Sequence, residues 1–397
     1  MKQLITILLF TTFLGCKQKA LDITIYAEQD ILSELSYGLE KLENQVQLDG
    51  GKVLLSNDRK GANILLEIQQ QKDNDREKND GFSIVKSNGG LTLSSESKRG
   101  LLYGLLDLSE QLSNNTKWNV IQDKSITAHH DFRAIKFNLP WYSYRSGEHL
   151  SLHTETCKDL KYWEKFLDMM VENKFNTLTL WNMHPYMYMV KSKSYPKASP
   201  FTDEEMVNWE AFWKSLFKMA KDRGIDTYIV NWNIFLPEAF SKEYGIAGYS
   251  SEGGSTFIGD GETNQDVENY MREVVTMTIN KYEDLTGIGI TLGERMGGMT
   301  SEERRDWADR TIIAGIKAAD RKVRLIYRAP LSAGKENHGT VSVSTEKLTR
   351  ETVENMGMDD DVWIEFKFNW SHAHSSPKLS IVHGGMLTDT YWEPYSD

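Results

Sequence analysis

The sequence predicts an α/β protein in which a small α/β domain precedes a (β/α)8 TIM barrel. A mixed strand and helix pattern gives way near residue 131 to a regular alternation of strand and helix, which is typical of a parallel sheet. The length of 397 residues also suits one barrel plus an accessory unit. We therefore place the accessory domain at 21–125 and the barrel domain at 131–397.

Apolar periodicity defines the elements of the accessory domain. Asn88-Gly89-Gly90 is a turn sequence typical of a hairpin between two short apolar runs. Apolar residues that recur every second residue predict strands at 23–26, 62–68, 81–85 and 91–93. Apolar residues that recur about every 3.6 residues predict helices at 32–42 and 97–108.

The barrel domain shows seven expected strands, with clear helices between most of them. Thr202 and Glu205 form a capping box at the start of one helix, and Gly224 ends it. The sequence stops at Asp397, directly after the seventh strand, so we expect an incomplete barrel and a fragment of a longer protein. We expect strands at 133–138, 177–181, 227–232, 287–292, 324–327, 362–368 and 385–391, and helices at 159–173, 203–223, 265–282 and 301–319.

The first sixteen residues predict a lipoprotein signal. A short cationic start and an apolar stretch lead to Leu14-Gly15-Cys16, which matches a bacterial lipobox. We expect Cys16 to be lipidated and to anchor the chain in the cell envelope, at the outer membrane of a Gram-negative bacterium, by acyl chains alone. The alternative is a plain secretory signal with an incidental cysteine.

Charge and composition exclude several partners. The net charge of −11 argues against nucleic acid, which requires a basic face. No cofactor is expected, and no phosphate-binding glycine loop is present. The sequence also lacks the nucleophile elbow that a Ser/His/Asp arrangement would need. No metal is expected either, since His372 and His374 lack further ligands nearby. The 11 tryptophans favour a ligand with flat apolar faces, such as a sugar.

Glu294 is the strongest candidate for catalysis. It follows the uncharged, β-branched run 287–292, which predicts a buried parallel strand. Barrel enzymes build their active sites at the C-terminal ends of such strands. We expect Glu294 to act as a general acid, with a simple ion pair to Arg295 as the alternative.

Polar and aromatic residues gather at the ends of the other expected strands. Rings can stack on sugar faces, and amides and cations can satisfy hydroxyls or a carboxylate. The alternative for any single member is an ordinary loop hydrogen bond. The candidate substrate-binding residues are Trp181, Asn182, His184, Trp232, Asn233, Arg328, Lys367, Asn369, His372 and His374.

A glycosidase usually needs a second carboxyl group beside its acid. Glu393, near the end of the seventh expected strand, is the preferred candidate by position. Glu365 comes earlier in its strand, and we expect it to pair with Lys367 or Arg328 inside the barrel. Asp389 is a third possibility.

The order of strands and helices in the accessory domain, with a strand pair followed by the helix at 97–108, resembles that of the domain before the barrel in bacterial hexosaminidases and α-glucuronidases. The barrel resembles glycoside hydrolase family 67, the α-glucuronidases, through Leu292-Gly293-Glu294-Arg295-Met296-Gly297 and through Lys367 and Asn369. That resemblance implies Glu294 as the acid and Glu393 as a second carboxylate. The stretch 370–374 contains no counterpart of the family's aspartate. Gly293 also replaces the aspartate with which hexosaminidases assist the substrate's acetamide.

These observations predict a lipid-anchored glycoside hydrolase that acts on a polysaccharide or oligosaccharide, with uronic acids among the expected sugars. Its partners would be the carbohydrate substrate and, through the anchor only, a membrane. The alternative is a non-catalytic surface protein that binds glycans on a glycosidase-like barrel.

Overall fold

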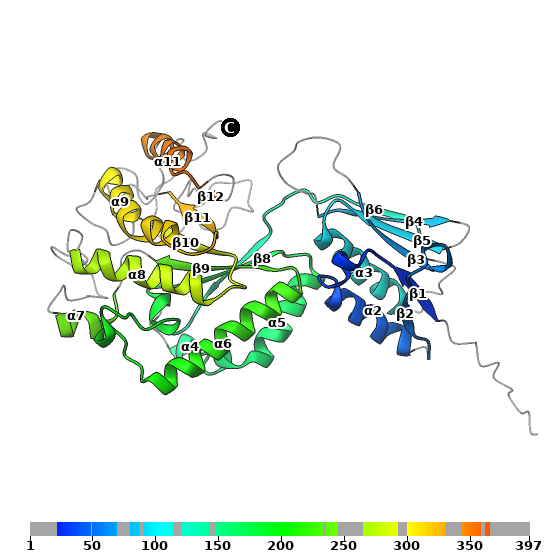
Figure 1. Ribbon diagram of the computed structural model, residues 1–397, viewed down its shortest axis with the longest axis horizontal. Helices are drawn as coiled ribbons and strands as arrows, with labels where there is room; N and C mark the ends of the chain where they lie inside the picture. Colours follow the sequence, from blue (N-terminus) through cyan, green and yellow to red (C-terminus); the bar gives the residue numbers. More distant parts are fainter. Residues whose placement is uncertain are drawn as a thin grey trace, which may run out of the picture. The chain divides into compact units, whose positions relative to one another are not determined.

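The computed structural model divides into two compact units, Met1–Asp131 and Phe132–Asp397, which are described separately (Figure 1). The residues that the structure describes are 22–48, 50–69, 80–87, 90–113, 121–142, 148–232, 236–244, 265–292, 300–329, 343–358 and 362–365.

The first unit is a six-stranded mixed sheet with the strand order β2-β1-β3-β5-β4-β6, in which β4 and β5 form the expected antiparallel hairpin. Gly104 of α3 lets this helix approach the sheet closely, because a Cβ there would lie 2.2 Å from Leu93 Cδ1. The elements are β1 (Ile23–Tyr26), α1 (Gln29–Leu32), α2 (Ser36–Leu48), β2 (Val53–Leu55), η1 (Arg59–Gly61), β3 (Ile64–Ile68), β4 (Phe82–Ser87), β5 (Gly90–Ser95), α3 (Lys98–Ser113) and β6 (Lys124–Ile126).

The second unit contains a parallel sheet with the order β12-β11-β10-β9-β8-β7, which confirms the predicted α/β barrel class. The seventh expected strand, 385–391, lies outside the described residues. The strands are β7 (Ala134–Asn138), β8 (Thr177–Asn182), β9 (Asp226–Trp232), β10 (Gly287–Thr291), β11 (Arg324–Arg328) and β12 (Val362–Glu365).

Helices connect these strands, as in other parallel sheets (Figure 1). No helix in the described ranges is long and apolar enough to cross a membrane. The helices are α4 (Glu148–Ser151), η3 (Thr156–Lys158), α5 (Leu160–Glu172), η4 (Pro185–Tyr188), η5 (Pro196–Ala198), α6 (Asp203–Asp222), α7 (Glu238–Tyr244), α8 (Gln265–Lys281), α9 (Ser301–Ala308), the π-helical turn η7 (Asp309–Ile313), α10 (Ala314–Lys317) and α11 (Val343–Asn355).

Capping boxes fix two of these helices. Glu205 N donates to Thr202 Oγ1 at 3.2 Å, and Thr202 N donates to Glu205 Oε2 at 2.8 Å, as the sequence predicted. Thr300 and Glu303 repeat this arrangement at α9. The helix expected at 301–319 differs in one respect, because η7 interrupts it where the Thr311 hydroxyl donates to Trp307 O.

The parallel sheet curls on itself. Neighbouring strands are separated by about 4.8 Å, so a flat sheet would hold β7 and β12 about 24 Å apart. Phe132, just before β7, and Trp363 of β12 nevertheless have ring centroids 4.9 Å apart. The concave face of the sheet therefore encloses a core, as in a barrel.

That inner core contains Trp181, Tyr228, Val230 and Ile326. Two glycines of β10 make room for it. A Cβ at Gly287 would lie 2.5 Å from Tyr228 Cε1, and a Cβ at Gly289 would lie 2.7 Å from Val230 Cγ2. Because side chains alternate along a strand, Thr291 belongs to the same inner face. β10 thus carries almost no side-chain volume on the concave side.

Candidate active site

Register places one layer of residues at the C-terminal ends of the strands. Thr291 is paired with Trp232 on one side and with Arg328 on the other, and Arg328 is paired with Glu365. Trp181 of β8 has its ring close to Arg328 across the inner face. This is the end of the sheet at which barrel enzymes hold their substrates.

Arg328 and Glu365 form an ion pair in this layer. The distance from Arg328 Nε to Glu365 Oε1 is 3.3 Å, so the sequence prediction that Glu365 pairs with Arg328 is confirmed. The Arg328 side chain is 8% exposed, whereas that of Glu365 is 42% exposed. The pair therefore combines a buried cation with a carboxylate that reaches solvent.

The ring of Trp181, on β8, contacts Arg328 of this ion pair and Lys136 of β7. Its indole Nε1 donates to Thr179 Oγ1 at 2.9 Å, and the residue is only 3% exposed. Arg328 Cζ lies 5.8 Å from the ring centroid, and Lys136 Nζ of β7 lies 3.7 Å from it. The ring thus contacts two cations, which is favourable because the face of an indole is electron-rich.

Sequence reasoning missed Lys136. The signal was present in the first expected strand, because residues two apart share a face and Lys136 comes two residues before Asn138, with which that strand ends. Lys136 sits on this face next to Thr179, its register partner on β8.

Asn182 and His184 are placed elsewhere. Asn182 follows Trp181 directly, so it points to the opposite face of the sheet, where its amide donates to Trp141 O and accepts from His184 N. His184 is fully buried, with Nε2 3.1 Å from the Tyr270 hydroxyl. Burial raises the pKa of Tyr270, so this hydroxyl stays protonated. These bonds tie the segment after β8 to α8, and they do not bring either side chain to Arg328.

The other candidate residues lie outside the described residues, with the exception of Trp232, of which only the backbone is described. Within the described ranges, no group of three or more His, Cys, Asp or Glu side chains could hold a metal ion. The residues outside the described ranges are Cys16, Asn233, Glu294, Lys367, Asn369, His372, His374, Asp389 and Glu393.

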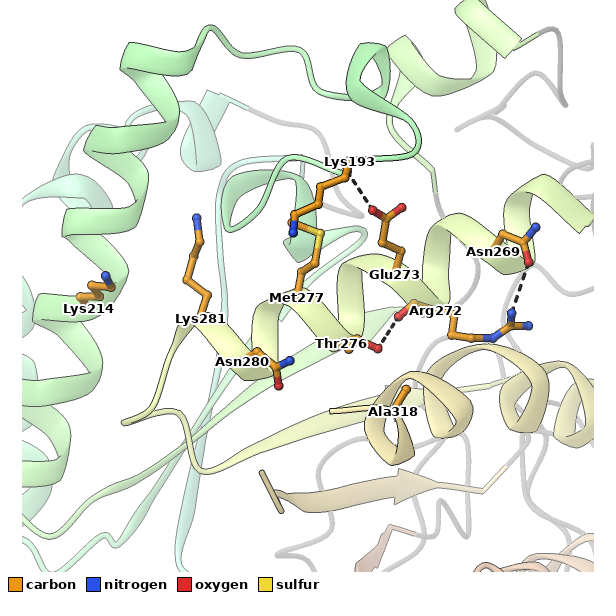
Figure 2. A pocket seen from close by; sticks show the side chains of 10 residues that line it. All are labelled: Lys193, Lys214, Asn269, Arg272, Glu273, Thr276, Met277, Asn280, Lys281 and Ala318. Atoms are coloured by element: carbon orange, nitrogen blue, oxygen red, sulfur yellow. Dashed lines mark hydrogen bonds between the residues drawn. The ribbon is translucent and has the colours of Figure 1, made fainter. Parts of the chain in front are cut away.

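A groove of about 810 Å³ lies on the helical layer instead of the strand ends (Figure 2). Its polar groups are largely paired within the protein. Glu273 accepts from the backbone N–H of Lys193 at 2.8 Å, and Lys214 and Lys281 both bind Glu210. We therefore do not assign the chemistry to this groove. It is lined by Lys193, Lys214, Asn269, Arg272, Glu273, Thr276, Met277, Asn280, Lys281 and Ala318.

Comparison with known proteins identifies the fold. Neither a protein-family description nor a curated protein sequence matches this chain. Solved structures do match. A GH138 enzyme targeting pectin rhamnogalacturonan II has a TM-score of 0.68 and 22% identity, covering 88% of this chain. The β-N-acetylhexosaminidase of Bacteroides fragilis has a TM-score of 0.52 and 14% identity, and the match covers 77% of this chain.

A mutant β-hexosaminidase of Streptomyces plicatus in complex with its product GlcNAc has a TM-score of 0.56 and 10% identity, and the match covers 92% of this chain and 74% of that one. The match to the B. fragilis enzyme covers 62% of that enzyme. This chain spans only 38% of the GH138 enzyme. At these identities the comparisons show the fold, which this chain shares with structures of glycoside hydrolases.

Proposed function

We propose that this chain is part of a glycoside hydrolase that acts on a uronic-acid-bearing polysaccharide or oligosaccharide. One observation carries the proposal: on the inner face of the curled sheet the cations of Arg328 and Lys136 contact one indole ring, and Glu365 forms an ion pair with Arg328. Cations of this kind suit a substrate carboxylate. The fold shared with glycoside hydrolases, one of them described as targeting pectin, supports the same class.

The proposed chemistry uses two carboxyl groups. Glu294 donates a proton to the departing glycosidic oxygen, and Glu393 activates water or attacks the anomeric carbon. Glu365 is the alternative partner, because its carboxylate is solvent-accessible on the inner face while Arg328 fixes its position. Carboxyl groups about 6.5 to 9.5 Å apart would give inversion, and about 5 Å would give retention. Arg328 and Lys367 would hold the uronate carboxylate in either case.

Within this activity we propose a substrate specificity like that of the α-glucuronidases, because the motif at 292–297 resembles that family. We also propose that Cys16 anchors the chain in the cell envelope after removal of the signal. Replacing Cys16 by Ser should then abolish incorporation of labelled palmitate in cells, and retained incorporation would contradict the anchor.

The test of the enzymatic proposal is the loss of turnover in single carboxyl variants. Turnover would be followed as the release of reducing sugar from uronic-acid-bearing oligosaccharides. Glu294→Gln should lower kcat by at least about a hundredfold, since one positioned acid contributes roughly 10² to 10⁴ in rate and the departing oxygen then has no proton donor. Comparison of Glu393→Gln with Glu365→Gln identifies the partner, because only one should cause a similar loss. Glu302→Gln, at the start of α9, is the matched control and should keep full activity.

The competing proposal is a non-catalytic protein that binds glycans. It predicts no turnover for the unchanged chain or for any variant, together with binding that the Glu294 substitution leaves intact. Measuring binding and turnover on the same preparation separates the two proposals.

A further inference from the structure

Lys136 was not among the residues predicted from the sequence, yet its side chain contacts the same Trp181 ring as Arg328. It is the central residue of β7, and its side chain is exposed. Its Nζ lies 3.7 Å from the centroid of the Trp181 ring, a distance at which the ammonium contacts the ring face. The position of this cation is thus set by an aromatic surface.

The Trp181 ring is itself held in place. Its Nε1 donates to Thr179 Oγ1, and that hydroxyl donates to the backbone carbonyl of Ile135 on β7 at 3.3 Å. The ring is buried, so it cannot serve as an open platform for a sugar. Its contacts with Lys136 and Arg328 make it a rigid spacer that positions two cations.

The two cations contact the same ring. Lys136 Nζ and Arg328 Cζ cannot lie further apart than their two distances to the same ring centroid, 3.7 and 5.8 Å, taken together. Two like charges at such a range repel each other. Glu365 contacts Arg328 at Nε, at 3.3 Å. An anionic group of a ligand bound beside this ring would be attracted by both cations.

We infer that Lys136 is a specificity-determining residue which, together with Arg328, binds the carboxylate of a uronosyl unit in the substrate. This inference rests on the proposed function for the identity of the ligand. It adds a residue from the first strand of the barrel unit to that site. It also changes the role of Trp181 from a stacking surface to a support for the two cations.

The experiment compares Lys136→Gln and Lys136→Arg with the unchanged chain. The probes are oligogalacturonides and the same oligosaccharides after reduction of their carboxyl groups to alcohols. Binding is measured by calorimetry at low ionic strength, and kcat and KM are measured where turnover occurs. Lys161→Gln is the matched control, because Lys161 is an exposed lysine near the start of α5.

Lys136→Gln should weaken binding of the acidic probe about tenfold, which corresponds to about 1.4 kcal/mol, and should raise KM with little change in kcat. Binding of the reduced probe should stay unchanged. Lys136→Arg should retain most of the affinity, and Lys161→Gln all of it. High salt should reduce the difference between the acidic and the reduced probe in the unchanged chain.

Equal losses for both probes would show that Lys136 only supports the structure, and this would overturn the inference. The inference is also overturned if the unchanged chain does not bind the acidic probe more tightly than the reduced probe. Preferential binding without any turnover would contradict the hydrolase proposal but support the role of Lys136. The two failures are therefore distinguishable.

Discussion

Replacement of Gly287 by Ala probes the packing that closes the concave face of the sheet. A Cβ at this position would lie 2.4 Å from the carbonyl oxygen of Arg324 and 2.5 Å from Tyr228 Cε1. The first contact is with the backbone of the neighbouring strand, so rotation of a side chain cannot relieve it. Tyr228 is 1% exposed and packs on Phe132, which leaves its ring little space to move.

Overpacking of this kind costs about 1 to 3 kcal/mol, and contact with backbone favours the upper end of that range. For a unit of this size, 1 kcal/mol corresponds to about 2 to 4 °C, so we expect Tm to fall by roughly 6 to 12 °C. The assay is thermal unfolding followed by tryptophan fluorescence. Gly61→Ala is the matched control, because the nearest atom to its Cβ would be Asp58 Oδ2 at 3.7 Å, an ordinary contact. A Gly287→Ala Tm within about 1 °C of the unchanged protein would refute this account of the inner face.

Three further predictions concern groups outside that face. Tyr270→Phe should lower stability by about 1 to 3 kcal/mol in urea unfolding, because it removes the partner of the buried His184 Nε2, and an unchanged midpoint would contradict that role. Hydrogen bonds from Lys214 and Lys281 lower the pKa of Glu210, so its stabilising effect should be present above the ordinary value of 4.5 and lost as pH falls through the lower folded-state value. The Tm difference between the protein and Glu210→Gln should therefore disappear on acidification, whereas a difference that grows would have the wrong sign. Burial raises the pKa of the Cys157 thiol to about 11, so in a chain with Cys16→Ser it should react with a thiol reagent only after denaturant is added, and rapid native labelling would contradict its burial.

Elements with strong local signals were predictable from the sequence. The capping box at Thr202 and the turn at Gly224 fixed the bounds of α6 almost to the residue. Uninterrupted apolar runs located β8 and β10. The edge strands β2 and β6 were missed because each has only three residues with largely exposed side chains, so neither shows the apolar alternation that marks a strand.

Site residues were harder to predict, because adjacency in sequence does not place two side chains on one face. Trp181 and Asn182 were both expected at the site, yet neighbours in a strand point to opposite sides. The Arg328–Glu365 pair was predictable, since the two residues end consecutive parallel strands. The contact of Lys136 with Trp181 was not, because it depends on the register between β7 and β8 and on a rotamer held by Thr179.

The contact between Phe132 and Trp363 also has a kinetic consequence. It joins the segment just before β7 to β12, so this contact of the inner core cannot form on the ribosome until β12 has been synthesised. Closing such a long loop is entropically costly, and topologies with many non-local contacts fold slowly. Until β12 has been synthesised, the core side chains of Trp181, Tyr228 and Val230 lack its cover, and chaperones have their greatest opportunity to bind nascent chains of this protein during that interval.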